Sequence, residues 1–341
     1  MIGQLTRSAI VRRGLAAAAM AVAALALGSC KPQGQAGAGN EPIVFSILPA
    51  ESQASTEPLW APLINDLRQQ TGLNIQLRFV PNYTVLVQAM AAGQTQVGWF
   101  SAQPALEATR RANAQVIGRI MDINGNMGYQ SVIITRKGSG ITLDSLLECN
   151  QRYSFGLGDA KSTSGTLAPM AFLFGPRNIE PDRCFRQVRN ANHQANALAV
   201  ANGVVDAATN NSVGIIFFQR QFPQQAAKID IIWRSPEIPE SAILVRKDLD
   251  PATTEKIRSF FLTYGTAQGA EGERQRQVLR GLEYGGFRAA DDSYLDPVRE
   301  MEASVALVEA RRTGDQARIA TAQQAYDAIH ARVAAAAEAR P

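Results

Sequence analysis

The sequence feature that most constrains the fold is an alternation, from Pro42 onward, of short apolar segments with longer segments of helical periodicity. Residues 43–48 are almost entirely apolar, as in a buried strand, and residues 58–70 carry leucines four positions apart, which predicts a helix. The pattern repeats through predicted strands at residues 74–80 and 96–100. Strands that alternate with helices indicate parallel βαβ units and therefore an α/β fold.

A second cycle of the same pattern begins at Tyr129. Its predicted strands are residues 130–136, 152–157, 185–188, 205–209, 229–233 and 241–245. The two cycles predict two similar lobes, because the strands of each cycle could form a sheet of their own. We expect residues 42–128 and 244–341 in lobe 1 and residues 129–243 in lobe 2, with extended crossings near 127–130 and 241–245.

The C-terminal segment differs from both cycles because it is rich in alanine and purely helical in pattern. Residues 296–312 and 315–337 predict two helices separated by Thr313-Gly314. The second predicted helix carries an apolar stripe at helical spacing, which consists of Ile319, Ala322, Tyr326, Ile329 and Val333. The stripe favours packing against lobe 1, and a homodimer contact is the alternative.

Residues 1–29 have the composition of an export signal. They contain three arginines, no acidic residue and a run of 14 uncharged, mostly apolar residues, whereas a spanning helix needs about 20. Leu27-Gly28-Ser29-Cys30 resembles a bacterial lipobox, in which small residues fit the signal peptidase and the cysteine thiol carries the lipid. We therefore expect a lipoprotein signal peptide at 1–29 and lipidation at Cys30. Ordinary cleavage, or twin-arginine export through Arg12-Arg13, are the alternatives.

The segment at 30–41 is polar and rich in glycine, which predicts a flexible tether. The protein would then lie in the cell envelope, in the periplasm, held to a membrane by its acyl chains alone. The formal charge of +4 does not argue for a nucleic-acid partner. Removing the three arginines of the leader leaves 31 basic against 30 acidic residues.

Two cysteines remain in the body of the chain, Cys149 and Cys184. Each lies just before a predicted strand, and neighbouring parallel strands would bring both thiols to one edge of the sheet. An exported protein can form a disulfide there, and two buried free thiols are the alternative. With two histidines and no Cys-x-x-Cys, the sequence offers no metal-binding pattern.

The segment most informative about function is residues 158–165, which join the end of a strand to the start of a helix. Open α/β sheets bind ligands at this position. Ser162, Thr163 and Ser164 would place three hydroxyl groups beside the unpaired amides and the positive dipole of a helix start, which suits an anion. Plain helix capping is the alternative. Phe155 and Ala160 stand where a nucleotide-binding P-loop requires glycines, so that reading is excluded.

Three further side chains are candidates for the same crevice. His193 follows another predicted strand and opens a helix, so its ring would face the hydroxyl groups. Tyr83 begins a helix in lobe 1 and Tyr129 lies at a crossing between lobes, from where both could close on a bound anion. A purely structural role is the alternative for each of the three.

Residues 42–302 resemble the periplasmic binding proteins of phosphonate ABC transporters, within the phosphate, phosphite and phosphonate-binding family. The resemblance is carried by Pro81-Asn82-Tyr83, Gly128-Tyr129-Gln130-Ser131-Val132, Gly158-Asp159-Ala160-Lys161-Ser162-Thr163-Ser164-Gly165, residues 193–202, residues 206–211 and Trp233-Arg234-Ser235-Pro236. It implies a two-lobed clamp with two crossing strands, the type II arrangement. It also implies phosphoryl contacts from Ser162, Thr163, Ser164 and His193, with Tyr83 and Tyr129 lining the rest of the cleft.

One departure from the family bears on the ligand. Members that bind aminoalkylphosphonates place acidic side chains opposite the amine, and the corresponding positions here are Val213 and Ser241, although Glu240 is adjacent. An ammonium without its ion pair would be buried at an uncompensated cost. We therefore expect a compact ligand, such as a neutral phosphonate, phosphite or phosphate, and discrimination against 2-aminoethylphosphonate.

The resulting hypothesis is a non-enzymatic lipoprotein, without a cofactor, that captures a phosphorus oxyanion and delivers it to an ABC permease and its ATPase. A ligand-sensing partner of a membrane receptor would use the same site. A serine hydrolase built on Ser164 and His193 is disfavoured, because the chain lacks the Gly-x-Ser-x-Gly nucleophile motif.

Overall fold

The computed structural model describes residues 41–338, and the chain from Pro42 onward forms one compact unit. The predicted signal peptide, Cys30 and nearly all of the tether lie outside the described residues. Among the helices that are described, none combines the length and apolar character needed to cross a membrane.

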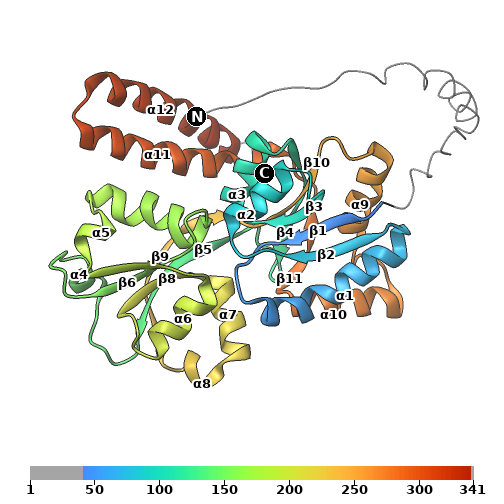
Figure 1. Ribbon diagram of the computed structural model, residues 1–341, viewed down its shortest axis with the longest axis horizontal. Helices are drawn as coiled ribbons and strands as arrows, with labels where there is room; N and C mark the ends of the chain where they lie inside the picture. The colour runs from blue at the N-terminus through green and yellow to red at the C-terminus, as the bar shows by residue number, and fades with distance from the viewer. Residues whose placement is uncertain (1–40, 339–341) are drawn as a thin grey trace, which may run out of the picture. The chain divides into compact units, whose positions relative to one another are not determined.

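Lobe 1 is built on a six-stranded sheet in the order β11-β4-β10-β3-β1-β2 (Figure 1). Its strands are β1 (Ile43–Ile47), β2 (Ile75–Phe79), β3 (Val97–Phe100), β4 (Ala114–Asp122), β10 (Ala242–Arg246) and β11 (Tyr284–Arg288). Its helices are α1 (Gln53–Thr71), α2 (Tyr83–Ala91), α3 (Ala102–Arg111), α9 (Pro251–Thr263) and α10 (Gly269–Gly281). Trp60 of α1 packs beside Phe45 of β1 in the core of this lobe, with ring centroids 5.9 Å apart.

Lobe 2 is built on a five-stranded sheet in the order β7-β6-β8-β5-β9. Its strands are β5 (Gly128–Arg136), β6 (Ser154–Leu157), β7 (Gln187–Asn190), β8 (Ala207–Asn211) and β9 (Ile229–Pro239). Its helices are α4 (Leu143–Leu146), α5 (Pro181–Cys184), α6 (His193–Ala201), α7 (Ser212–Gln221) and α8 (Pro223–Ala226), with π-helical turns at Thr163–Leu167 and Met170–Phe174. Phe155 of β6 stacks on Phe185 at 4.5 Å in its core.

The two sheets share one topology, which is that of a two-lobed type II clamp. In lobe 1, β1 pairs in parallel with β2 and β3, and β10 then pairs antiparallel with β3. In lobe 2, β6 pairs in parallel with β7 and β8, and β5 pairs antiparallel with β8. The antiparallel strand of each sheet enters from the other lobe, through the connections β4 to β5 and β9 to β10. The predicted two-lobed α/β fold is confirmed, and the residue limits of the lobes stay a prediction.

The predicted parallel βαβ units are present in both sheets, but two strands of the lobe 1 sheet were missed. Both β4 and β11 pair antiparallel at one side of the lobe 1 sheet. Gly118 and Arg119 interrupt the apolar pattern of β4, and two adjacent glycines interrupt β11, so neither resembles a strand in isolation. The helix expected after residue 165 is instead wound partly as π-helix, with the amide of Leu167 bonded to the carbonyl of Ser162.

The C-terminal residues form the helical hairpin α11 (Asp296–Thr313) and α12 (Gln316–Glu338), broken at Gly314, which has a φ of +71°. Figure 1 shows the two helices lying side by side. Ile329 is buried and the rest of the predicted stripe is partly buried, which places the stripe against α11 rather than against lobe 1 itself. Because this face is used within the chain, the stripe no longer supports a homodimer.

Helix α11 contacts both lobes. It packs against α3 of lobe 1 and against the π-helical turns and β9 of lobe 2. The Arg110 guanidinium of α3 pairs with Glu302 at 2.7 Å, and the Arg312 guanidinium donates to Asn178 at 2.8 Å. The hairpin therefore lies across the junction between the lobes.

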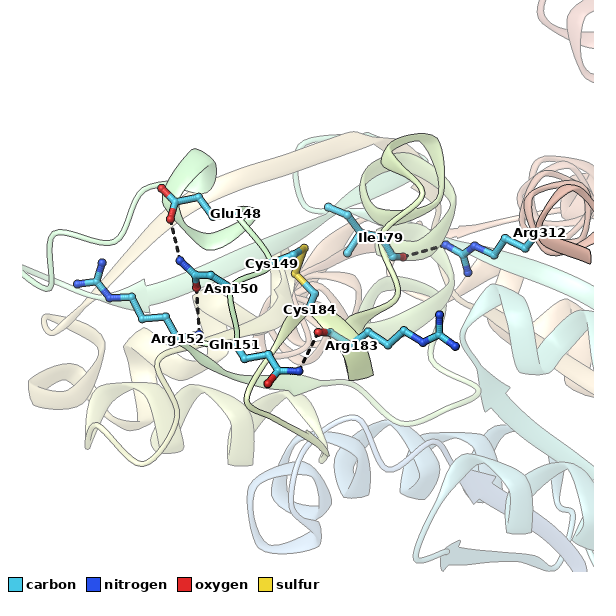
Figure 2. Close-up of a disulfide and its surroundings, with 9 residues drawn as sticks. All are labelled: Glu148, Cys149, Asn150, Gln151, Arg152, Ile179, Arg183, Cys184 and Arg312. Carbon is cyan, nitrogen blue, oxygen red and sulfur yellow. Dashed lines mark hydrogen bonds between the residues drawn. A yellow bond between two sulfur atoms is a disulfide. The ribbon is translucent and has the colours of Figure 1, made fainter.

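Cys149 and Cys184 form a disulfide in lobe 2 (Figure 2). The bond joins the connection between α4 and β6 to the end of α5, and Gln151 donates to the carbonyl of Arg183 beside it at 3.4 Å. The 35-residue loop that it closes contains β6 and the predicted anion-binding segment at 158–165.

We predict that replacing both cysteines with alanine lowers the free energy of unfolding by about 4 kcal/mol, because the 35-residue loop is then unrestrained in the unfolded chain. Urea unfolding of native and variant protein measures the difference. Reductant should reproduce the loss in the native protein and leave the variant unchanged. Equal stability of the two oxidised proteins would contradict the prediction.

Candidate functional site

A cleft between the lobes is lined by side chains from both sheets and both crossings. Seven of the predicted residues lie on its wall: Tyr83, Tyr129, Ser162, Ser164, His193, Val213 and Ser241. These residues lie around one cleft although they are up to 158 positions apart in the chain, from Tyr83 to Ser241.

The loop before the first π-helical turn is fixed by two glycines in close contact. A Cβ on Gly158 would lie 2.5 Å from the Cα of Gly165, and one on Gly165 would lie 2.7 Å from the Cα of Gly158. The amide of Gly158 donates to the carbonyl of Gly165 at 2.9 Å. Hydroxyl groups of Thr209 and Ser131 bond the carbonyls of Gly165 and Ser164 at 2.7 and 2.6 Å. These hydrogen bonds fix the loop to the sheet of lobe 2.

The three consecutive hydroxyl groups take different positions. The Ser162 hydroxyl accepts from the amide of Gly165 at 2.9 Å and caps the turn. The Ser164 hydroxyl lies 3.3 Å from Nε2 of His193. Thr163 does not line the cleft, since its hydroxyl accepts from the amide of Gln103 at 2.8 Å and lies 3.3 Å from the hydroxyl of Ser101. In this structure the Thr163 hydroxyl contacts lobe 1, and its expected contact with a ligand stays a prediction.

His193 is the first residue of α6, whose start is capped by the Asn192 side chain, which accepts from the amide of Ala195 at 2.8 Å. The ring is buried, and burial lowers the pKa of His193 to about 4. Its Nδ1 has no hydrogen-bond partner among the described residues. A neutral imidazole presents one N–H donor, which is suited to an oxyanion and carries no charge of its own.

The two tyrosines complete a group of neutral donors. The Tyr129 hydroxyl is hydrogen-bonded to Ser164 and Thr163, and the Tyr83 hydroxyl to Ser162. Burial, the largest cause, raises the pKa of both tyrosines well above the usual value. Both hydroxyl groups therefore keep their protons. No lysine or arginine is among the residues lining the cleft.

Two acidic side chains, Glu51 and Glu240, also line the cleft, and the sequence analysis did not assign either. Glu240 is 6% exposed and accepts a hydrogen bond from the amide of Ser241 at 2.5 Å. Burial raises the pKa of Glu240, and no basic side chain opposes that effect. Val213 and Ser241 do line the wall without charge, as expected, but the inference that the wall lacks an acid was wrong.

An apolar part of the wall was also missed. Trp99 at the end of β3, Phe217 on α7 and Tyr284 on β11 lie around the same cleft. The indole Nε1 of Trp99 is buried and has no partner within the described chain. Aromatic residues inside short strands and helices resemble ordinary core residues, so no sequence signal distinguished them.

The lobes are in direct contact around the cleft. Lys161 of lobe 2 pairs with Glu107 of α3 at 2.9 Å, and Arg220 of α7 pairs with Glu283. The Asp159 carboxylate accepts from the amide of Tyr83 at 3.3 Å. Contacts of this kind on several sides of the cleft define a closed clamp.

A family described as "ABC transporter, phosphonate, periplasmic substrate-binding protein" matches residues 45–295. The Phosphonates-binding periplasmic protein of Escherichia coli strain K12 is 36% identical over 258 residues, which are 75% of each chain. The Phosphate-import protein PhnD of Mycolicibacterium smegmatis is 27% identical over 274 residues, 76% of this chain and 84% of that protein.

Solved structures give the same result. A binding-protein component of an ABC phosphonate transporter from Pseudomonas aeruginosa superposes with a TM-score of 0.81 at 31% identity, covering 86% of this chain and 98% of that one. PhnD1 from Prochlorococcus marinus, solved in complex with methylphosphonate, has a TM-score of 0.68 at 19% identity, covering 76% and 96%. The second match extends the likeness of fold alone.

The buried, neutral state of His193 predicts a specific pH dependence of stability. The unfolded imidazole takes up a proton near pH 6.5, whereas the folded one resists protonation down to about pH 4. Between these values the native protein should lose about 3 kcal/mol of unfolding free energy relative to a His193→Gln variant as the pH falls. Urea unfolding across this range measures the difference. His330→Gln, which removes the exposed histidine of α12 and its contact with Glu300, is the control and should not reproduce the difference. Parallel curves for His193→Gln and native protein would contradict the prediction.

Proposed function

Because the chain belongs to the family of periplasmic substrate-binding proteins of phosphonate ABC transporters, we propose that it holds a phosphonate between its lobes and presents it to a membrane permease. The observation that carries this proposal is the cluster of neutral donors from both lobes on the wall of the cleft. Ser162, Ser164, His193 and the two tyrosines together form a cradle for a tetrahedral oxyanion.

The mechanism is capture by closure. The oxyanion docks on the loop and α6 of lobe 2, and lobe 1 then brings in Tyr83. Each hydrogen bond to a charged group contributes about 1.5–3 kcal/mol, so five or six of them, less desolvation and ordering costs, support micromolar or tighter binding. The closed form, in which the two lobes are in contact, is the form that a permease would recognise.

The ligand class follows from the acids on the wall. A cleft with two carboxyl groups and no basic side chain is poorly suited to a compact dianion. It suits a phosphonate whose substituent is cationic, since Glu240 can pair with an ammonium while the donors hold the phosphonate oxygens. This reverses the preference expected from Val213 and Ser241 alone.

The site does not favour hydrolysis, although Ser164 lies beside His193. A serine nucleophile needs a base that a third group orients, and Nδ1 of His193 has no acidic partner in the described part of the chain. We infer that the ligand is bound and released unchanged.

Membrane attachment and partners belong to the same proposal. A lipid on Cys30 would keep the protein in the periplasm beside the permease and its ATPase. A sensing partner of a membrane receptor would use the same closed form. Deleting the permease distinguishes the two roles, because phosphonate uptake is lost if the protein serves transport and is retained if it serves sensing.

The experiment that tests the function is calorimetric titration of the protein with 2-aminoethylphosphonate, methylphosphonate, phosphite, phosphate and sulfate. We expect phosphonates to bind with micromolar or tighter affinity and sulfate to bind weakly. Absence of binding to every phosphorus compound would contradict the proposed function.

We further predict that Glu240→Gln weakens binding of 2-aminoethylphosphonate about 30-fold, because it removes a buried ion pair worth about 2 kcal/mol. Methylphosphonate, which has no ammonium, should change by less than threefold in the same titration. Glu237→Gln, on the exposed face of β9, is the matched control. An equal loss of affinity for both ligands would show that Glu240 does not recognise the substituent of the phosphonate.

A further inference from the structure

The turn between β1 and α1 meets the start of α6 across the cleft. The amide of His193 donates to the carbonyl of Ala50 at 3.2 Å, and the amide of Ser52 donates to the side-chain oxygen of Gln194 at 3.2 Å. Between these two bonds, the carboxyl of Glu51 accepts from the amide of Gln194. Three consecutive residues of lobe 1 are thereby bonded to two consecutive residues of lobe 2.

Glu51 belongs both to this interlobe contact and to the wall of the ligand cleft. Part of the residue remains accessible at the mouth, but its carboxyl group is enclosed by protein. The other ionisable groups on the wall of the cleft are Tyr83 on α2, Tyr129 on β5, His193 on α6, Glu240 after β9 and Tyr284 on β11, and no lysine or arginine lines it. Burial raises the pKa of Glu51 to about 8, only partly offset by the Gln194 amide.

The protonation state of this carboxyl decides what it can do. A neutral carboxyl group has one acceptor oxygen for the Gln194 amide and one O–H donor, which remains for a ligand oxygen. An ionised carboxylate has only acceptors, and in a cleft without basic side chains it would repel an oxyanion.

We propose that Glu51 couples closure of the lobes to the charge of the ligand, accepting from Gln194 with one oxygen and donating its proton-bearing oxygen to the bound oxyanion. This inference rests on the proposed phosphonate site and adds a regulatory property to it. Binding then requires one proton on Glu51, which is taken from solvent whenever the empty cleft is ionised.

The test is calorimetric titration of the full chain with methylphosphonate at pH 7 and pH 9, one unit on either side of the titration of Glu51. If only the protonated form binds, native affinity should fall by at least about tenfold more than that of Glu51→Gln over this interval, because the pKa of about 8 belongs to the closed cleft and an open cleft exposes the carboxyl group to water. Titration of the free ligand cancels in the comparison. Glutamine keeps an acceptor for Gln194, and Glu57→Gln, exposed on α1, is the control that should follow the native protein.

A second measurement follows the proton itself. At pH 9, each protein is titrated in two buffers of different ionisation enthalpy, after circular dichroism has shown that both are folded. The native protein should take up about one proton more per bound ligand than Glu51→Gln does. Equal pH dependence and equal proton uptake in native and variant protein, with binding retained, would overturn the role of Glu51 and leave the phosphonate site standing. Failure of the native protein to bind any phosphonate at pH 7 would overturn both.

Discussion

The proposed phosphonate site depends on one constraint, which is that an anion must be held inside the protein by groups that carry no charge. No lysine or arginine lines the cleft, His193 is neutral, and both tyrosines keep their protons. Neutral donors bind an anion more strongly than water does only when they are oriented before the ligand arrives. The rest of lobe 2 serves that orientation.

The orientation begins with the sheet. Gly158 and Gly165 approach so closely that neither tolerates a side chain, and hydroxyl groups from β5 and β8 hold the loop carbonyls away from the cleft. The disulfide closes the chain around this loop, and α11 packs on the turns that follow it. Thr163 then extends the same loop to lobe 1 through Ser101 and Gln103. The proposed ligand contacts and the contacts between the lobes therefore lie on one segment of backbone.

Much of this arrangement could be predicted from the sequence, and the failures have physical causes. The βαβ pattern predicted both lobes, and strand-to-helix turns predicted the positions of Ser162, Ser164 and His193, because such turns gather at one edge of a sheet. Strand β11 was missed because its glycines interrupt the apolar pattern. The contact of Thr163 with lobe 1 could not be predicted, because adjacent hydroxyl groups of a turn point in different directions. Glu240 was misjudged because a one-residue difference in a crossing strand decides which side chain faces the cleft.

The measurement that tests the account most directly is a crystal structure of the protein grown with 2-aminoethylphosphonate. The account predicts an intact phosphonate between Ser164, His193 and Tyr83, with its oxygens within hydrogen-bond distance of neutral donors and no lysine or arginine in contact. A phosphonate bound to a basic side chain elsewhere, or a cleft closed without it, would contradict the account.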